Sequence, residues 1–234
     1  TKKRSEKQLV EIVYAIAKRL EVKKIKLIDS NMLLSNWYML WLEKASKSFL
    51  TYQLAIDLQL SINDIRLGFR KSYRPLVNKA LKEWDTKVYE GNIDDVFEEF
   101  RLLHLEVSGK ETRSRESWGI QKEQVKSNEA LLVTVRDGDI LIGAGFFTYT
   151  KNEGSYSIGA YKRELFDKPI AHGVQMKAIE ALKEKGCKTY HVGKKMTLLD
   201  ENVPTDKELS ISHFKEGFAG YIYAQPYLEV DLNE

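Results

Sequence analysis

The residues best suited to chemistry lie near the C-terminus, in the segment Lys207–Gly220 with the sequence KELSISHFKEGFAG. An aromatic residue and a lysine, Phe214 and Lys215, stand there next to a second aromatic residue that is flanked by glycines. This order of residue types follows an expected helix and strand, and it is less common than a short apolar run. Together with the strands that precede it, the segment indicates acyl transfer to an amine.

Two histidines are candidate general bases for such a reaction, because an imidazole titrates near working pH. His172 opens an expected helix that faces an expected cleft, and His213 directly precedes the aromatic–lysine pair. A capping or packing role is the alternative for His172. The four histidines of the chain are scattered without a metal-ligand spacing, so we predict no metal site.

Other polar side chains are candidate substrate ligands. Arg113 and Arg115 lie in the polar segment KETRSRESW, expected to be a loop, and an arginine binds phosphate or carboxylate through two N–H groups. Tyr156 and Tyr161 lie on an expected strand, where a hydroxyl could bind the acceptor or a carbonyl. Gln175 lies one turn inside an expected helix and could face the same cleft. A solvated charged loop and half-buried strand tyrosines are the structural alternatives.

Hydrophobic periodicity predicts the elements that position these residues. In the first half of the chain we expect a helix at 8–20, a strand at 24–28, a helix at 33–42, a strand at 49–58, a helix from 62 whose apolar stripe continues to 84, and a helix at 93–107. Pro75 is expected to end or kink the helix that starts at 62, because proline has no N–H to donate.

The second half has a clearer pattern. We expect strands at 130–136, 140–149 and 155–161, a helix at 172–185, a strand at 188–193, a short helix at 206–218 and a strand at 221–230. The first three strands are closely spaced and predict an antiparallel meander. A helix between the later strands implies a parallel neighbour pair. Such a mixed sheet is expected to splay and form a cleft where its strands diverge.

The first 58 residues repeat part of this order, as helix, strand, helix and strand. The sequence KRLEVKKIKLI at 18–28 also resembles LKEKGCKTYHV at 182–192 in layout. We interpret residues 1–58 as the trailing half of a second, similar unit and residues 59–234 as the main domain. An unrelated helical cap is the alternative for the N-terminal segment.

The composition is that of an ordinary folded protein, with 234 residues, of which 43% are hydrophobic and 30% charged. The net charge of +3 tolerates an anionic substrate without requiring nucleic acid. The only cysteine, Cys187, excludes a disulfide within the chain and a cysteine-based zinc site, which favours a reducing, cytoplasmic compartment. No apolar run is long enough to predict a membrane span, and no signal peptide is visible.

Three motifs give the chain a family resemblance. LTYQLAIDLQLSINDIRLGFRKSYRPLVNKA resembles the strand and basic helix of the FemAB-like transferases, DGDILIGAGFFTY resembles their hairpin, and SHFKEGFAG resembles their phenylalanine–lysine motif. The motifs occur in the family's order from about Thr51 to Val230. The resemblance implies an α/β (α+β) fold of the GNAT acyltransferase superfamily, with a mixed, mainly antiparallel sheet flanked by helices and a partial second GNAT-like unit at the N-terminus.

The resemblance also implies roles for individual residues. In peptidoglycan enzymes of this kind the motif's lysine lies at the reaction centre, a role that falls here to Lys215, with Phe214 shaping the pocket. A fixed cation that faces a developing oxyanion contributes on the order of 3 kcal/mol. Family members also carry an arginine and an aromatic residue in a similar place, which matches Arg113 or Arg115 with Trp118.

The acyl donor stays open between aminoacyl-tRNA and acyl-CoA, and no tightly bound cofactor is expected. Acyl-CoA enzymes of this fold have a glycine-rich loop before the central helix, whereas the corresponding segment here, KRELFDKPIA, has no glycine. Lys162, Arg163 and Lys168 could hold phosphate by charge near the helix N-terminus. Lys194 and Lys195 follow a strand end and could add to this phosphate site.

A group of basic residues on the helical segment after residue 62 could contact a tRNA acceptor end or a nucleotide diphosphate. A solvated helix face is the alternative for these side chains. The group comprises Arg66, Arg70, Lys71, Arg74, Lys79 and Lys82.

Two functional hypotheses follow from these observations. The first is a FemAB-like transferase that moves an acyl or aminoacyl group to a small amine acceptor, either an amino sugar or a peptidoglycan-type precursor, with or without a linked nucleotide. The second is a non-catalytic GNAT-like module that binds a nucleotide-linked ligand or a partner protein. The incomplete N-terminal unit and the missing glycine loop motivate the second. The sequence leaves the oligomeric state open.

Overall fold

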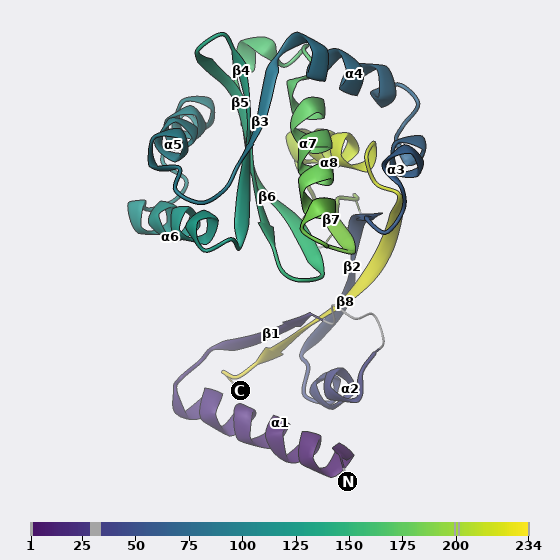
Figure 1. The fold of residues 1–234 in the computed structure, drawn as a ribbon. Helices are drawn as coiled ribbons and strands as arrows, with labels where there is room; N and C mark the ends of the chain where they lie inside the picture. Colours follow the sequence, from purple (N-terminus) through teal and green to yellow (C-terminus); the bar gives the residue numbers. More distant parts are fainter. Residues whose placement is uncertain (1, 29–33, 199, 201, 234) are drawn as a thin grey trace. The chain divides into compact units, whose positions relative to one another are not determined.

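The computed structural model describes residues 2–28, 34–198, 200 and 202–233 (Figure 1). The chain divides into two compact units. The smaller unit comprises Thr1–Gln53, Lys194–Leu209 and Ile222–Glu234, and the larger comprises Leu54–Gly193 and Ser210–Tyr221. The predicted boundary between residues 58 and 59 stays a prediction. Residue 33, where a helix was expected to begin, lies outside the described residues.

The larger unit contains most of the helices and a strand meander. Its elements are α3 (Ile62–Gly68), α4 (Tyr73–Glu83), β3 (Asp85–Tyr89), α5 (Asp94–Ser108), α6 (Arg115–Lys126), β4 (Ala130–Asp137), β5 (Ile140–Tyr149), β6 (Glu153–Tyr161), the 3₁₀ helix η1 (Arg163–Leu165), α7 (Ile170–Glu184), and parts of β7 (Thr189–Lys195) and α8 (Asp206–Glu216).

The smaller unit contains the two ends of the chain. Its elements are α1 (Lys2–Arg19), β1 (Lys24–Ile28), α2 (Asn36–Leu42), and parts of β2 (Lys47–Asp57) and β8 (Tyr221–Asp231). Its strand order is β1-β8-β2, and β1 pairs with β8 antiparallel. Its core gathers Val10 and Ala17 from α1, Trp41 from α2, and Leu228 and Val230 from β8.

The sheet of the larger unit has the strand order β2-β7-β6-β5-β4-β3. Strands β3 to β6 are antiparallel to one another, whereas β6 and β7 are parallel. The expected meander and the expected parallel neighbour pair are therefore confirmed.

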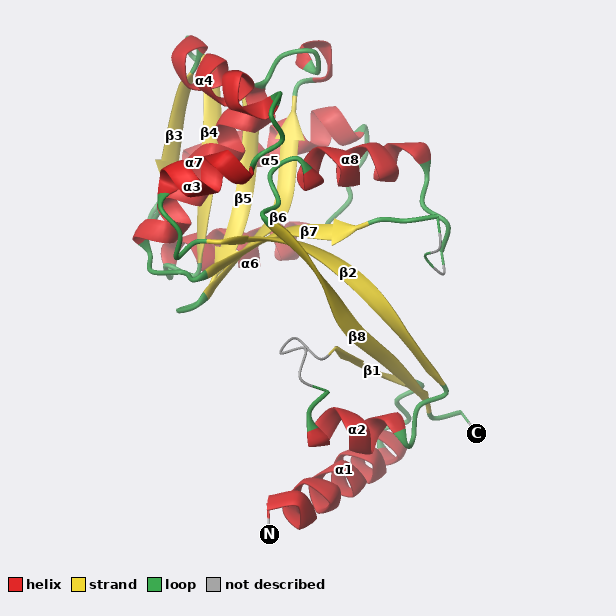
Figure 2. Ribbon diagram, turned by 90° about the vertical axis from the view of Figure 1, so that its right-hand side faces the viewer, coloured by secondary structure: helices red, strands yellow, loops and turns green. Residues whose placement is uncertain are grey.

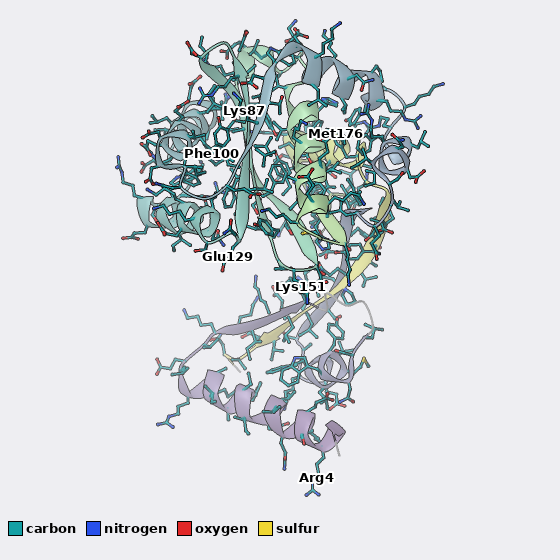
Figure 3. The ribbon with its side chains drawn as sticks, in the orientation of Figure 1. Arg4, Lys87, Phe100, Glu129, Lys151 and Met176 are labelled. Atoms are coloured by element: carbon teal, nitrogen blue, oxygen red, sulfur yellow. The ribbon has the colours of Figure 1, made fainter. Side chains whose placement is uncertain are left out.

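Two apolar layers cover this sheet. Helices α3, α4 and α7 share a core with one face, and α5 and α6 share a second core with the other. Figure 1 shows α5 and α6 on one side of the strands and α7 on the other, and Figure 2 looks at the sheet from the α7 side. The buried side chains of Phe100 on α5 and Met176 on α7 mark the two layers in Figure 3.

The structure corrects three local expectations. The helix that starts at Ile62 ends at Gly68 before the proline, and Pro75 lies in the first turn of α4, where a missing N–H breaks no helical bond. The segment KETRSRESW is not all loop, since the Ser114 side chain accepts from Ser117 N and caps α6. Strand β3 was not expected. It lies at the edge of the sheet, and its residues are exposed or partly exposed.

A bulge in β6 determines which side chains share a face. Phe146 lies opposite Ile158, but the next residue of β5, Phe147, lies opposite Tyr156, so Ser157 is the extra residue. The pleat therefore changes phase, and Tyr156 and Tyr161 point to the same side although they are five positions apart. Both tyrosines pack against the core on the α7 face.

Candidate functional site

Strands β6 and β7 separate shortly after they pair. Their parallel register covers Glu153 opposite Thr189, Gly154 opposite Tyr190 and Ser155 opposite His191. In the part of the chain that the structure describes, the β7-facing edge of β6 has no strand partner from Tyr156 onward. This is the splay that the mixed topology predicts.

The side chain of Lys215 reaches into this divergence from α8. Its Nζ lies 5.3 Å from the ring centroid of Tyr156 on β6. A Cβ added to Gly193 on β7 would lie 2.6 Å from the same Nζ, so the ammonium sits against the β7 backbone. Gly193 also has a φ of +142°, a conformation that other residues rarely adopt. Both the close contact and the backbone conformation therefore require glycine at this position.

The environment of Lys215 leaves its charge available. The side chain is partly buried, and burial lowers the pKa of its ammonium. Among the described residues, no carboxylate forms an ion pair with Lys215, and desolvation is the only cause of its pKa shift. A cation without a counter-ion in a partly desolvated place is suited to hold a developing negative charge.

Tyr156, whose ring contacts this ammonium, belongs to a pair of tyrosines. The Tyr156 and Tyr161 hydroxyl oxygens are 3.0 Å apart, and the Tyr156 ring stacks on Phe147 with centroids 5.0 Å apart. Burial raises the pKa of Tyr156 to about 12 and that of Tyr161 well above its ordinary value. Both phenols therefore stay protonated near neutral pH. One donates to the other, which leaves one O–H for a ligand.

An aromatic cluster surrounds His172 at the start of α7. The imidazole lies 4.5 Å from Tyr73, 5.3 Å from Phe214 and 5.6 Å from Phe218, measured between ring centroids. Both of its ring nitrogens are buried, and neither has a hydrogen-bond partner among the described residues; burial lowers the pKa of His172 to about 4. The geometry favours the packing interpretation for His172, and its role as a base stays a prediction.

The second candidate base lies on a different side of α8. The His213 ring is exposed, with Nδ1 3.4 Å from Arg70 Nη2 and 3.9 Å from a Glu216 carboxylate oxygen. Residues two apart on a helix do not share a face, so His213 and Lys215 point in different directions. The structure therefore does not bring this imidazole to the ammonium.

Gln175 is fully buried in the core of the larger unit. Its side-chain oxygen accepts a 2.6 Å hydrogen bond from the Tyr190 hydroxyl, and no residue that the structure describes bonds its Nε2. Tyr190 was not expected to contribute, and burial raises its pKa well above the ordinary value. The pair links α7 to β7 from inside the core.

The candidate arginines lie apart from Lys215. Trp118 belongs to the core on the α5–α6 face, and the Arg113 guanidinium lies 5.7 Å over its ring. Arg113 Nη1 is also 3.4 Å from His104 Nε2, and Arg115 is the first residue of α6. Arg113 therefore contacts Trp118, but both lie across the sheet from the Lys215 side, and their role as substrate ligands stays a prediction.

The candidate phosphate ligands have protein partners. Arg163 donates from Nε to Val107 O at 2.8 Å, and Nη2 bonds the same carbonyl. Lys162 lies 3.9 Å from Glu164. Lys168 lies 3.2 Å from Asp167, and Lys194, in the smaller unit, lies 2.8 Å from Asp200.

Several basic residues of α3, of α4 and of the segment between them also contact other protein groups. Arg70 donates to the Tyr73 hydroxyl at 3.2 Å and to His213 O at 3.1 Å, and Arg66 donates to Asn78. Arg74 donates to Leu67 O, and Lys79 lies 3.9 Å from Glu83. Their predicted contact with nucleic acid stays a prediction.

Sequence reasoning missed Gly193 and Tyr73. The available signal for Gly193 was a glycine at the end of an expected strand, HVG, since glycine in a strand often marks a close approach to the backbone. Tyr73 carried no comparable signal, because its role depends on packing between α4, α7 and α8. The described residues contain no group of ligands that could hold a metal ion and no helix long and apolar enough to cross a membrane.

No protein-family model and no curated protein sequence matches this chain. Among solved structures, FemX is similar over 99% of this chain and 77% of its own, with 15% identity and a TM-score of 0.72. The C-terminal domain of a putative lysylphosphatidylglycerol synthetase from Agrobacterium fabrum is similar over 96% of this chain and 73% of its own, with 12% identity and a TM-score of 0.71. L-PGS from Bacillus licheniformis covers 97% of this chain and 73% of its own, with 16% identity and a TM-score of 0.65. The chain therefore has the fold of FemX and of these two lysylphosphatidylglycerol synthetase and L-PGS structures, as the resemblance implied.

Proposed function

We propose that the chain is a transferase that moves an acyl or aminoacyl group to an amine at the divergence of β6 and β7. The observation that carries the proposal is the Lys215 ammonium, held between Tyr156 and Gly193 without a carboxylate partner among the described residues. The fold shared with FemX, with a putative lysylphosphatidylglycerol synthetase and with L-PGS supports it.

The proposed reaction assigns one task to each polar group. The amine nitrogen attacks the carbonyl carbon of the donor, a C–N bond forms, and the carbonyl oxygen becomes an oxyanion. Lys215 and the free O–H of the tyrosine pair donate to this oxygen. The oxyanion then collapses, the C–O bond of an ester or the C–S bond of a thioester breaks, and the amine proton passes through water to the leaving group.

We favour an aminoacyl ester, such as aminoacyl-tRNA, over acyl-CoA as the donor. A CoA diphosphate needs free cations or N–H groups before the central helix. In this chain that segment lacks glycine, and Lys162, Arg163 and Lys168 contact protein groups instead. The acceptor we propose is the amine of an amino sugar or a peptidoglycan-type precursor.

A transfer assay with two donors tests the proposal. Purified chain is incubated with labelled aminoacyl-tRNA or labelled acetyl-CoA and a panel of amine acceptors that includes UDP-linked amino sugars and peptides. We expect label on an amine from the aminoacyl donor and at least a roughly hundredfold loss with Lys215→Ala. Absence of transfer from both donors, or equal transfer by Lys215→Ala, would reject the proposal.

The absence of glycine from the segment before α7 also favours a second candidate, a module that binds a nucleotide-linked ligand or a partner without catalysis. Isothermal titration with tRNA, acetyl-CoA and UDP-sugars separates the two. Saturable binding without any product in the transfer assay indicates the binding module. Product formation that depends on Lys215 indicates the enzyme.

A further inference from the structure

The smaller unit has an apolar helix face that its own core does not use. In α1, Val10 and Ala17 are 1% and 8% exposed and belong to the core. Other apolar residues of this segment are exposed to solvent, among them Ile12 at 53% and Leu20 at 69% exposure. Positions three and four apart lie on the same side of a helix, so the open residues form one continuous stripe. The stripe consists of Leu9, Ile12, Val13, Ile16 and Leu20.

Positive charge is concentrated in the segment of the chain that contains this stripe, although Lys24 and Lys26 on β1 pair with Glu229. Residues 1–28 contain nine lysines and arginines and three glutamates, although the whole chain has a net charge of only +3. The remaining residues are therefore net negative. Arg19 and Lys23 are exposed near the C-terminal end of the stripe, and Arg4 extends from the other end of α1 (Figure 3).

We infer that α1 binds to an anionic membrane surface and lies in its plane. Leu9, Ile12 and Ile16 enter the boundary between headgroups and acyl chains, while Arg4, Arg19 and Lys23 lie at the level of the lipid phosphates. A helix with an apolar face and a basic polar face binds in this way, through buried apolar area together with attraction to anionic lipid. The inference concerns the smaller unit alone and is independent of the proposed transferase activity.

A comparison of α1 with α7 distinguishes two possible partners of the stripe, a lipid surface and a protein sheet. The turn after α1 and the turn after α7 have the same hydrogen bond, from Val22 N to Ala17 O at 3.0 Å and from Cys187 N to Leu182 O at 3.1 Å. Both helices end five positions before their strand begins. The two helix–strand pairs can therefore be compared residue by residue, with Ala17 matched to Leu182.

This match shows that a sheet would cover only part of the stripe on α1. Leu9, Val13 and Ile16 correspond to the buried residues Val174, Ala178 and Ala181. Ile12 in α1 corresponds to Lys177 in α7, and Leu20, directly after α1, corresponds to Lys185, directly after α7. Helix α7 is covered by its sheet, yet Lys177 and Lys185 lie outside that cover and pair with Glu180 and Glu90. A sheet packed on α1 in the same way would leave Ile12 and Leu20 in water. A membrane surface covers the whole stripe.

Vesicle flotation with the full chain tests the inference. The probes are vesicles of phosphatidylcholine and vesicles with roughly one phosphatidylglycerol to three phosphatidylcholines, since one basic residue near an anionic surface contributes about 1 kcal/mol. We expect binding to the anionic vesicles that weakens steeply with salt, and much weaker binding to phosphatidylcholine alone. Ile12→Glu combined with Ile16→Glu should lower binding by about tenfold or more.

Matched variants in the larger unit serve as controls. Ile120 is 65% exposed on α6, so Ile120→Glu makes the same chemical change away from α1 and should leave binding unchanged. Arg19→Glu with Lys23→Glu should weaken binding to anionic vesicles by at least about tenfold. Lys151→Glu with Lys188→Glu reverses two exposed charges elsewhere and should not. Circular dichroism checks that each variant keeps its helix content.

Two results would overturn the inference. One is the absence of binding to anionic vesicles at low salt, or binding that Ile12→Glu with Ile16→Glu does not reduce. The other is a dimer of the wild-type chain in solution that Ile16→Glu splits and that anionic vesicles do not compete with. The second result would assign the stripe to another copy of the chain.

Discussion

Lys215 is a residue at which stability and proposed function make opposite demands. A partly buried cation without a carboxylate partner costs folding free energy, and burial already lowers the pKa of its ammonium. We therefore expect Lys215→Met to keep or raise the free energy of unfolding while transfer falls by about a hundredfold or more. Urea denaturation and the transfer assay measure the two effects. Loss of stability and activity in parallel would indicate that Lys215 only supports packing.

Gly193 allows the position of that ammonium to be tested without removing it. Gly193→Ala would place a Cβ 2.6 Å from Lys215 Nζ, and the side chain would have to leave its place against β7. We expect transfer to fall by about tenfold or more, with a backbone cost of about 1–2 kcal/mol from the positive φ. Gly186→Ala is the matched control, because Gly186 has a φ of +81° and open space where the Cβ would go. It should lose similar stability but keep its activity.

The imidazole of His172 should make stability depend on pH. Its pKa is about 4 in the folded state and near 6.5 when exposed, so the unfolded chain binds the extra proton between these values. The contribution is complete above pH 6.5 and is lost as the pH falls toward 4, by up to about 3 kcal/mol. His172→Phe, which keeps an aromatic ring against Tyr73 and Phe214, should flatten this part of the profile.

Urea denaturation across this pH range measures the difference in the free energy of unfolding between the wild type and His172→Phe. The carboxylates titrate in both proteins, so their contribution cancels in this difference. His213→Gln is the control, since it removes an imidazole that is exposed on α8 instead of buried. An identical pH profile for His172→Phe and the wild type would contradict the buried, neutral state of His172.

At the scale of elements, the bulge in β6 connects the sheet to the site. Because Ser157 is extra, the Tyr156 hydroxyl folds over Gly159 toward Tyr161, and a Cβ at Gly159 would lie only 1.9 Å from that oxygen. We expect Gly159→Ala to cost about 1–3 kcal/mol of stability. Tyr156→Phe removes the oxygen, so the double variant should lose less than the two single variants combined. A strictly additive pair in urea denaturation would show that the hydroxyl does not contact Gly159.

The helices and strands also show which elements can be predicted from sequence patterns and which cannot. Apolar periodicity predicted the meander and α7 because these segments are buried on one or both faces, and hydrophobic residues there repeat with the period of the element. It missed β3 and α6, whose positions are mostly partly exposed and polar. The prediction of the site from the sequence is limited in a similar way. The motif identified Lys215, but no local pattern records the bulge at Ser157, the contact with Gly193 or the placement of Trp118 across the sheet.

At the scale of the whole molecule, the two units have cores of different size. The smaller core depends on few large side chains, among which Trp41 is 1% exposed. Replacing a buried tryptophan with alanine costs about 3–5 kcal/mol, which is a large share of the stability of a small unit. We therefore expect Trp41→Ala to open the smaller unit by itself.

Hydrogen exchange measured by mass spectrometry checks this expectation segment by segment. In Trp41→Ala, amides of α1, β1 and α2 should exchange much faster, by about a hundredfold or more for a loss of 3 kcal/mol. Amides of α7 and β4, whose residues belong to the core of the larger unit, should keep their wild-type protection. Strands β2 and β8 contribute residues to both units, so their exchange should rise at the ends that belong to the smaller one. Equal acceleration in α7 and β4 would mean that the two units unfold as one cooperative body, since local opening would then not be separable from global unfolding.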